Sequence, residues 1–267
     1  FLVAVFWIPL FVSQNTFFFI SMFLAMIVGL VDDVRGSAPR IKITIFILIS
    51  LLLMTDGYLI SSAGVYLGVN IEIFYVISIF LTLFAVVAFT NAFNLIDGLD
   101  GLSGLLGIII LTSFAYIGHV NNDKFLLLIP LIIISSLIVF LIFNWNPAKV
   151  FLGDSGSLLI GFIISILGIR SLDFIQPIAI LYIAAIPIFD SIVVFFRRLN
   201  KKQNPFQPDR THLHHNLLFR TKNVKKTVLI MAMIQICFSI IGLTLIVNIE
   251  DSFISLIIFL IFLFTIY

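Results

Sequence analysis

Long apolar stretches separated by short polar segments dominate this chain. A helix that crosses a membrane needs about 20 mainly apolar residues, with a range of roughly 17–25. The shorter stretches would be completed by neighbouring residues. The pattern therefore predicts an all-α fold, a polytopic membrane helix bundle with about ten transmembrane helices. The ten stretches are residues 1–12, 16–31, 41–55, 73–90, 102–118, 125–143, 156–169, 175–196, 227–247 and 252–267.

Composition supports a membrane protein. Of the 267 residues, 61% are hydrophobic and 10% are charged, and the mean hydropathy is +1.24. Soluble domains carry roughly 25% charged residues. The single cysteine, Cys237, lies within an apolar stretch and has no disulfide partner, so it is expected to be a small hydrophobic residue. We expect residues 1–267 to form one integral membrane domain.

The basic residues are unevenly distributed between the two sets of connecting segments. Thirteen of the fifteen Lys and Arg residues fall in one set, nine of them in segment 197–226. Only Lys124 and Arg170 fall in the other set. Loops rich in Lys and Arg face the cytoplasm. The polar motifs "DDVRGSAPR", "NAFNLIDGLDG", "NWNPAKVFLGDSGS" and "NPFQPDRTHLHH" are therefore all expected on the cytoplasmic face, where helix ends and loops of a bundle can build a site.

Adjacent carboxylates end the first complete helix at Asp32 and Asp33. They repel one another and oppose the helix dipole at a C-terminus. A divalent cation or a cationic substrate would relieve this conflict. The alternative is a charged helix end with Arg35 as the salt-bridge partner.

A second polar set recurs every three residues at Asn91, Asn94, Asp97 and Asp100. On a regular helix each step of three residues turns a position by about 60°, so the four would spread over half of the circumference. The interleaved glycines would permit kinks, close packing or close approach to a ligand. Two Asn and two Asp in this setting predict a polar site.

Three further features are candidates for phosphate chemistry. Asp154, on a glycine-flanked turn in "FLGDSGS", is either a Mg²⁺ ligand or the N-cap of the following helix. Asp190 lies two turns before Arg197 and is either part of the site or a polar contact to a neighbouring helix. Next to Asp209, a basic cluster suits a phosphorylated anion better than zinc; it contains Arg210, His212, His214 and His215.

These motifs together resemble the polyprenyl-phosphate N-acetylhexosamine-1-phosphate transferases. The resemblance covers nearly the whole chain through the Asp pair, "NAFNLIDGLDGL", "FLGDSGS", "IPIFDSIVVFFRRL" and "PFQPDRTHLHH". Within the family it is closest to the bacterial branch that acts on undecaprenyl phosphate and UDP-GlcNAc. The phospho-MurNAc-pentapeptide branch typically carries three consecutive histidines, whereas this chain has His-Leu-His-His. The family's first helix and the Pro- and Gly-rich segment after it have no counterpart here, so the native N-terminal helix is expected to be missing.

The resemblance implies a Mg²⁺-dependent reaction, with Mn²⁺ as an alternative metal. N-acetylhexosamine 1-phosphate, in the first place GlcNAc-1-phosphate, would pass from a UDP-sugar to undecaprenyl phosphate with release of UMP, starting a lipid-linked cell-envelope glycan such as O-antigen. By resemblance, Asp154 would bind the metal with help from Asn94. Asp32 and Asp33 would position the lipid phosphate and the metal.

The resemblance also implies roles for the remaining candidates. Phe151 would stack on the uracil ring, and Asp97 and Asp100 would line the nucleotide pocket. The basic cluster Arg210, His212, His214 and His215 would hold the pyrophosphate and the sugar, and Asn91 and Asp190 would complete the substrate-binding set.

The implied partners are the UDP-N-acetylhexosamine, undecaprenyl phosphate and the lipid bilayer, with no nucleic acid and with a homodimer left open. The expected location is the bacterial cytoplasmic (inner) membrane. The same chemistry on another UDP-N-acetyl sugar is the main alternative. A transporter would instead place its acids near the membrane midplane in an inverted repeat.

Overall fold

Helices make up almost all of the structure. The computed structural model describes residues 15–202, 212–248 and 252–266, so the apolar stretch 1–12 and Arg210 lie outside the described residues. The described part contains eleven helices and one β-hairpin. In chain order they are α3 (Thr16–Arg35), α4 (Pro39–Met54), β1 (Ser62–Tyr66), β2 (Val69–Glu72), α5 (Tyr75–Leu95), α6 (Leu102–Val120), α7 (Lys124–Asn144), α8 (Gly153–Ser171), α9 (Pro177–Ile183), α10 (Ala185–Asn200), α11 (Leu213–Thr221), α12 (Val224–Asn248) and α13 (Ser252–Ile266).

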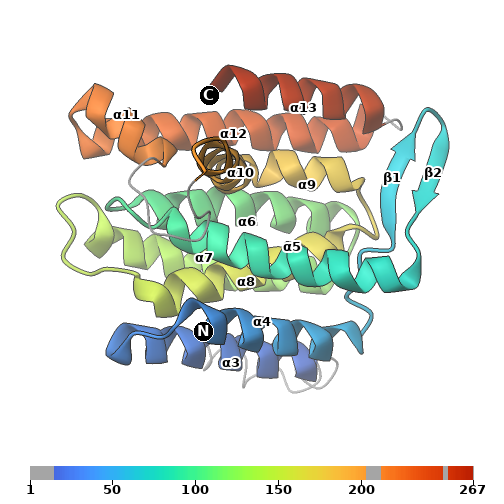
Figure 1. The fold of residues 1–267 in the computed structure, drawn as a ribbon, viewed down its shortest axis with the longest axis horizontal. Coiled ribbons are helices and arrows are strands. Elements are labelled where there is room, and N and C mark those ends of the chain that lie inside the picture. The colour runs from blue at the N-terminus through green and yellow to red at the C-terminus, as the bar shows by residue number, and fades with distance from the viewer. Residues whose placement is uncertain (1–14, 203–211, 249–251, 267) are drawn as a thin grey trace.

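The long helices run side by side along one axis, with the hairpin at one end of the bundle and α11 at the other (Figure 1). The most extensive helix pairs are α6 with α7, α3 with α8, and α5 with α8. Large apolar side chains fill the space between them; Phe18, Phe93, Phe114 and Phe162 are each 0% exposed. Within a membrane, packing contacts of this kind hold helices together, because lipid is as apolar as the helix faces.

The predicted membrane helix bundle is confirmed. Six described helices are long and apolar enough to cross a membrane, or seven if α9 and α10 form one bent span. Helices α4, with 16 residues, and α13, with 15, follow the predicted stretches but fall short of that length. The count of ten spans therefore stays a prediction.

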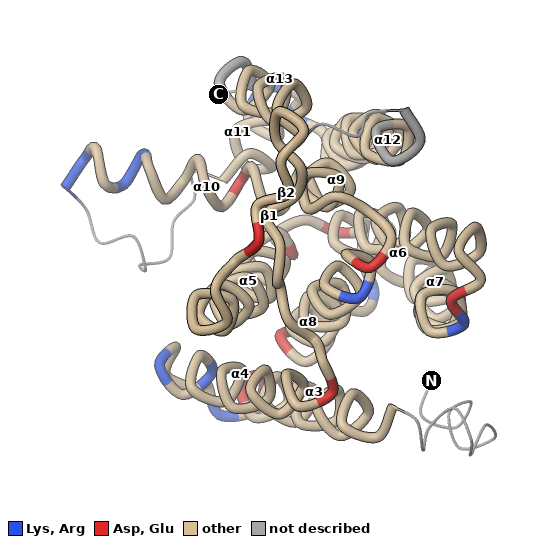
Figure 2. Tube along the Cα trace, turned by 90° about the vertical axis from the view of Figure 1, so that its right-hand side faces the viewer, with Lys and Arg blue, Asp and Glu red and all other residues tan. Residues whose placement is uncertain are grey.

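The stretch 175–196 was expected to be one helix and is instead two. Helices α9 and α10 are bent by 90° at Ala184, and α10 leaves the bundle sideways with basic residues at its far end (Figure 2). Pro187, in the first turn of α10, cannot donate the backbone hydrogen bond that would continue α9 into α10.

The connection 56–72 contains the antiparallel hairpin of β1 and β2, a departure from a purely α fold. Its turn residues Leu67 and Gly68 have positive φ values of 51° and 77°. Positive φ values at both positions are typical of two-residue hairpin turns. The β-branched residues on either side suit strands. The predicted polytopic α-helical architecture is otherwise retained.

Helices α3 and α8 meet where the site is built. A Cβ atom on Gly29 would lie 2.6 Å from the carbonyl oxygen of Asp154. Glycine thus lets the end of α3 lie directly against the start of α8. Asp32 and Asp33 are brought next to Asp154 in this way.

Candidate active site

Asp33 caps helix α8. Its carboxylate oxygens accept hydrogen bonds from the backbone N–H of Asp154 (2.8 Å) and of Ser155 (3.0 Å). The first N–H groups of a helix lack partners within it, and a carboxylate is favoured there by the helix dipole. Gly153, with a φ of 68°, allows the close approach, since a Cβ atom would lie 2.9 Å from Asp33 Oδ2. The N-cap alternative for Asp154 is therefore wrong: Asp154 lies in the first turn of α8, and Asp33 supplies the capping oxygens.

Asp32 and Asp154 share one cation, the ammonium group of Lys42. Lys42 Nζ lies 2.6 Å from Asp32 Oδ2 and 3.2 Å from Asp154 Oδ2. The other oxygen of Asp32 accepts hydrogen bonds from the backbone N–H (2.6 Å) and hydroxyl (2.5 Å) of Ser37. Among the described residues, the ion-pair partner of Asp32 is thus Lys42, and the Arg35 alternative is wrong.

Asn94 joins α5 to the same carboxylate. Its side-chain amide donates to Asp154 Oδ1 (3.0 Å) and to the Ser157 hydroxyl (2.8 Å). Helix α5 ends at Leu95, one residue later. Asn91 lies one turn earlier on α5 with an exposed side chain and is not among the residues that line the pocket described below.

Asp97 and Asp100 lie in the turn between α5 and α6, so the regular helix assumed for this motif ends before them. Asp97 is mostly buried and accepts a hydrogen bond from the Ser103 hydroxyl. Burial raises the pKa of Asp97 to about 6, because desolvation outweighs the hydrogen bond from Ser103.

Asp100 anchors the loop between α7 and α8. One of its oxygens accepts hydrogen bonds from the Asn146 amide (2.8 Å) and the Ala148 backbone N–H (3.0 Å). Asn144 completes the connection, because its side-chain oxygen accepts from the Gly101 backbone N–H at 2.8 Å. The turn and the loop that form the two walls of the pocket are therefore fixed to each other.

A pocket of about 320 Å³ opens between these elements. Phe151 lies at its rim with 73% of its surface exposed. An exposed aromatic ring beside a polar pocket offers a face for a planar ring to stack on. The polar residues that line the pocket are Asn94, Asp97, Asp100, Asn144 and Asp154.

The histidine cluster is held by Asp190. The buried carboxylate of Asp190 contacts His212 Nδ1 at 2.8 Å and accepts a hydrogen bond from the Leu213 backbone N–H at 2.6 Å. His214 Nε2 packs directly on Gly98, where a Cβ atom would collide with the imidazole. Asp190 thus connects α10 to the start of α11, and α11 contacts the turn that carries Asp97.

The histidine rings pack on one another. The ring centroids of His212 and His214 are 5.6 Å apart, and those of His214 and His215 are 4.2 Å apart. Burial lowers the pKa of His214 to about 4, so its ring is neutral near pH 7. Arg210, predicted to act with these histidines, lies outside the described residues.

The residue that sequence reasoning missed is Lys42. The charge pattern assigns Lys42 no role beyond that of one basic residue on the cytoplasmic face. A Lys that lies ten residues after Asp32, at the start of an apolar helix, was a usable signal. Ser157 and Ser103, which bond Asn94 and Asp97, are also new, and small hydroxyl residues of this kind carry little signal in a membrane helix.

The groups around Asp154 that could offer oxygen ligands are carboxylates and a side-chain amide. Such oxygen atoms suit a hard cation such as Mg²⁺. Asp32 and Asp154, from separate helices, already converge on one positive charge. No cluster of three or more His, Cys, Asp or Glu side chains with metal-binding geometry occurs among the described residues. Two carboxylates and one side-chain amide therefore lie close together beside the pocket.

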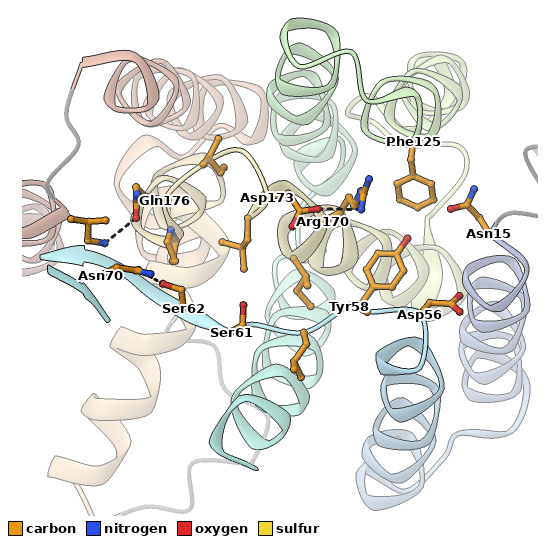
Figure 3. Close-up of a pocket in the computed structure, with 17 residues that line it drawn as sticks. Asn15, Asp56, Tyr58, Ser61, Ser62, Asn70, Phe125, Arg170, Asp173 and Gln176 are labelled. Atoms are coloured by element: carbon orange, nitrogen blue, oxygen red, sulfur yellow. Dashed lines mark hydrogen bonds and ion pairs between the residues drawn. The ribbon is translucent and has the colours of Figure 1, made fainter. Parts of the chain in front are cut away.

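A larger pocket, of about 730 Å³, lies at the hairpin end of the bundle (Figure 3). Its Arg170 is already engaged by Asp123 at 2.7 Å and by Asp173 at 3.1 Å. None of the predicted site residues lines this pocket. Size alone therefore does not identify the site, and the smaller pocket beside Asp154 is the better candidate.

The fold and the site define a polytopic membrane protein whose carboxylates, amides and histidines gather at one end of a helix bundle. Residues 15–172 match the model of glycosyl transferase family 4. The chain belongs to that family.

Curated relatives agree with this assignment. The chain is 31% identical over 238 residues to a probable undecaprenyl-phosphate N-acetylglucosaminyl 1-phosphate transferase of Bacillus subtilis, an alignment that covers 87% of this chain and 66% of the relative. It is 32% identical over 215 residues to undecaprenyl-phosphate alpha-N-acetylglucosaminyl 1-phosphate transferase of Escherichia coli K12, covering 74% of this chain and 58% of the relative. The chain thus spans about three fifths to two thirds of the length of these relatives.

Proposed function

We propose that this protein transfers N-acetylhexosamine 1-phosphate, in the first place GlcNAc-1-phosphate, from a UDP-sugar to undecaprenyl phosphate. The observation that carries the proposal is the convergence of Asp32, Asp154 and Asn94 beside a pocket with an exposed aromatic rim. The names of the relatives from Bacillus subtilis and Escherichia coli support the lipid acceptor and the sugar.

In this reaction an oxygen of the lipid phosphate attacks the phosphorus atom that is linked to the sugar. The bond between that phosphorus and the bridging oxygen of the diphosphate breaks, and UMP leaves with the bonding electron pair. Two anions must approach each other, so catalysis consists mainly of positioning and charge neutralisation. A phosphate monoester is largely ionised near pH 7, since its second pKa is about 6, so no strong base is needed.

Mg²⁺ held by Asp154, with Asp32 and Asn94 next to it, would neutralise phosphate oxygens when bound. Lys42 contributes a fixed positive charge between the same two carboxylates. Asp33 keeps Asp154 in place through the α8 cap. Direct displacement fits this arrangement, because the carboxylates already have cationic or backbone partners.

Nucleotide recognition is assigned to the pocket of about 320 Å³. Phe151 would stack on the uracil ring, and Asp97 would accept hydrogen bonds from the nucleotide. Asp100 acts mainly by holding the loop that carries Phe151. The ring of His214 is neutral near pH 7. It would therefore form a hydrogen bond with the sugar or the phosphate and no ion pair with the phosphate.

We further propose that the site faces the cytoplasm of a bacterial inner membrane. Lys225 and Lys226 lie in the first turn of α12, which follows α11 at the site end of the bundle (Figure 1), and the positive-inside rule places such residues in the cytoplasm. In a Cys237→Ser background, Phe219→Cys on α11 and Val69→Cys on the hairpin can be labelled in intact cells. An impermeant reagent should modify only Val69→Cys, and modification of Phe219→Cys alone would reverse the orientation.

The direct test of the function is UMP release by the membrane-embedded protein. Undecaprenyl phosphate and a panel of UDP-sugars are supplied with Mg²⁺, Mn²⁺ or a chelator. Release that requires the lipid, a UDP-N-acetylhexosamine and the metal supports the proposal. Release without the lipid acceptor would contradict it.

A further inference from the structure

The break between α9 and α10 leaves backbone groups without their helical partners. In a continuous helix the N–H of Ile186 would bond to the carbonyl of Tyr182, and the residue at 187 would bond to the carbonyl of Ile183. Pro187 has no N–H, and the 90° bend separates the first pair. Buried backbone groups of this kind must find partners inside the protein, because lipid offers none.

Side chains of α12 satisfy these groups: Gln235 makes the short hydrogen bonds, and the Ser239 hydroxyl adds a longer one of 3.4 Å to the Ile183 carbonyl. Gln235 of α12 is 0% exposed. Its Oε1 accepts from the Ile186 backbone N–H at 3.0 Å, and its Nε2 donates to the Ile183 carbonyl at 2.7 Å. The same Nε2 lies 3.5 Å from the Tyr182 carbonyl oxygen. The side-chain amide therefore bonds one backbone N–H and one carbonyl that have no helical partner at the break.

The residues after the break pack against the candidate active site. Ile186 belongs to a buried cluster that includes Ile96 and Leu102, which flank the turn carrying Asp97. One turn further along α10, Asp190 holds His212. The direction in which α10 leaves the bend therefore decides where the histidine cluster lies relative to the pocket.

We infer that Gln235 is a positioning residue for the active site. It fixes the bend between α9 and α10, and through Ile186 and Asp190 it places the histidine cluster on the Asp97 turn. Gln235 does not line the pocket, so it acts on substrate only through these residues. The inference rests on the proposed function for its kinetic consequences.

The test compares Gln235→Met with a matched control, Gln176→Met. Gln176 lies at the opposite end of the bundle, where its side-chain oxygen accepts from the Val65 backbone N–H at 3.1 Å (Figure 3). Both substitutions remove hydrogen bonds to backbone and keep a long unbranched side chain. Only the first concerns the bend.

Two readouts separate positioning from general stability. The first is UMP release, analysed as kcat and KM at a temperature where both variants are fully folded. The second is the fluorescence of Trp145, which packs on the same cluster as Leu213 and Leu217 of α11. The chain has two Trp residues, so the measurement is made in a Trp7→Phe background.

Gln235→Met should lower kcat about 10- to 100-fold, since small displacements in a site have effects of that size, and should shift the Trp145 emission. Gln176→Met should change neither. Equal kinetics and equal emission in the two variants would overturn the inference. If the wild-type protein releases no UMP, the proposed function fails, while the Trp145 comparison still decides whether Gln235 sets the position of α11.

A conservative variant adds an independent check and also serves if Gln235→Met does not accumulate. In Gln235→Glu the neutral carboxylic acid has one donor and one acceptor and can make both bonds, whereas a carboxylate can only accept. The partners of Gln235 are neutral backbone and hydroxyl groups. Gln235→Glu should therefore keep activity at low pH and lose it at high pH, relative to the wild type and to Gln176→Glu. An unchanged pH profile would contradict the positioning role.

Discussion

The carboxylate of Asp33 accepts a hydrogen bond from the backbone N–H of Asp154 and so caps the helix whose first turn carries Asp154. The two acids that follow one another at the end of α3 thus have different tasks. Asp32 shares Lys42 with Asp154, whereas Asp33 fixes the position of Asp154 itself. These two separate roles explain why two carboxylates are adjacent at the end of α3.

Removing the cap should affect both stability and turnover. Asp33→Ala should lower the free energy of unfolding by about 1 kcal/mol, the usual cost of a lost cap, and should reduce UMP release strongly because Asp154 loses its support. Asp123→Ala is the control, because Asp123 caps α7 at the hairpin end through the Leu126 N–H at 2.8 Å. Because Asp123 also pairs with Arg170 at 2.7 Å, the control should lose at least as much stability as Asp33→Ala and keep its kcat. Equal activity losses in both variants would show that the cap matters only for folding.

Replacing Lys42 should separate metal binding from turnover. In Lys42→Met the carboxylates of Asp32 and Asp154 lose their shared cation, so Mn²⁺ should bind more tightly, as measured by electron paramagnetic resonance. UMP release should nevertheless fall, because a positive charge beside the transferring phosphate is lost. Lys149→Met, on the loop at the same end of the bundle, should change neither quantity. Weaker Mn²⁺ binding in Lys42→Met would contradict the view that Lys42 and the metal share one set of ligands.

The buried carboxyl of Asp97 should make stability depend on pH. Its pKa is raised from 3.8 to about 6, so the folded protein holds a proton more tightly than the unfolded chain. The resulting stabilisation is complete below about pH 4 and is lost as the pH rises through about 6. At roughly 1.4 kcal/mol per pKa unit, the change is on the order of 2–3 kcal/mol.

Asp97→Asn removes the titrating group and should flatten this pH dependence. Thermal unfolding of the wild type and the variant in detergent from pH 4 to pH 7 measures the difference. Asp56→Asn, in the exposed turn after α4, is the control and should follow the wild type. A difference between wild type and Asp97→Asn that does not change with pH would refute the assignment.

Phe151 should contribute to nucleotide binding alone. Phe151→Ala should weaken UMP binding by about 1–3 kcal/mol, the range for stacking of a base on an aromatic ring. Binding of undecaprenyl phosphate should barely change, and Phe151→Trp should retain most of the UMP affinity. If Phe151 instead anchors its loop to the bilayer, Phe151→Ala would weaken both ligands equally and lower the protein yield.

The sequence predicted the helical segments well because a span of about 20 apolar residues leaves little choice in lipid. The polar motifs around Asp154 were also expected to meet, since charge asymmetry put them on one face. The bend at Ala184 was not predicted, although Pro187 was visible, because a single proline does not reveal which partner satisfies the broken backbone. That partner, Gln235, is 49 residues away from Ile186.

The individual partners in the site were less accessible to sequence reasoning. The roles of Asp33 and Asp154 at the start of α8 were not separated, because a cap supplied by a distant helix has no local signature. The contact of Lys42 with Asp154 spans 112 residues and has no local signature either, whereas its contact with Asp32, ten residues away, carried a local signal. The hairpin carried a local signal in its Leu67-Gly68 turn, but it lay between apolar runs that directed attention to helices.

The central claim is that the phosphorus atom next to the sugar moves together with the sugar. UDP-GlcNAc labelled with ³²P in the sugar-linked phosphate and with ³H in the sugar tests this directly, with undecaprenyl phosphate as acceptor and Asp154→Asn as the inactive control. The wild type should give a lipid product that carries both labels in the starting ratio, together with unlabelled UMP, and Asp154→Asn should give neither. A lipid that carries ³H without ³²P, with labelled UDP in solution, would contradict the account, because the enzyme would then transfer the sugar alone.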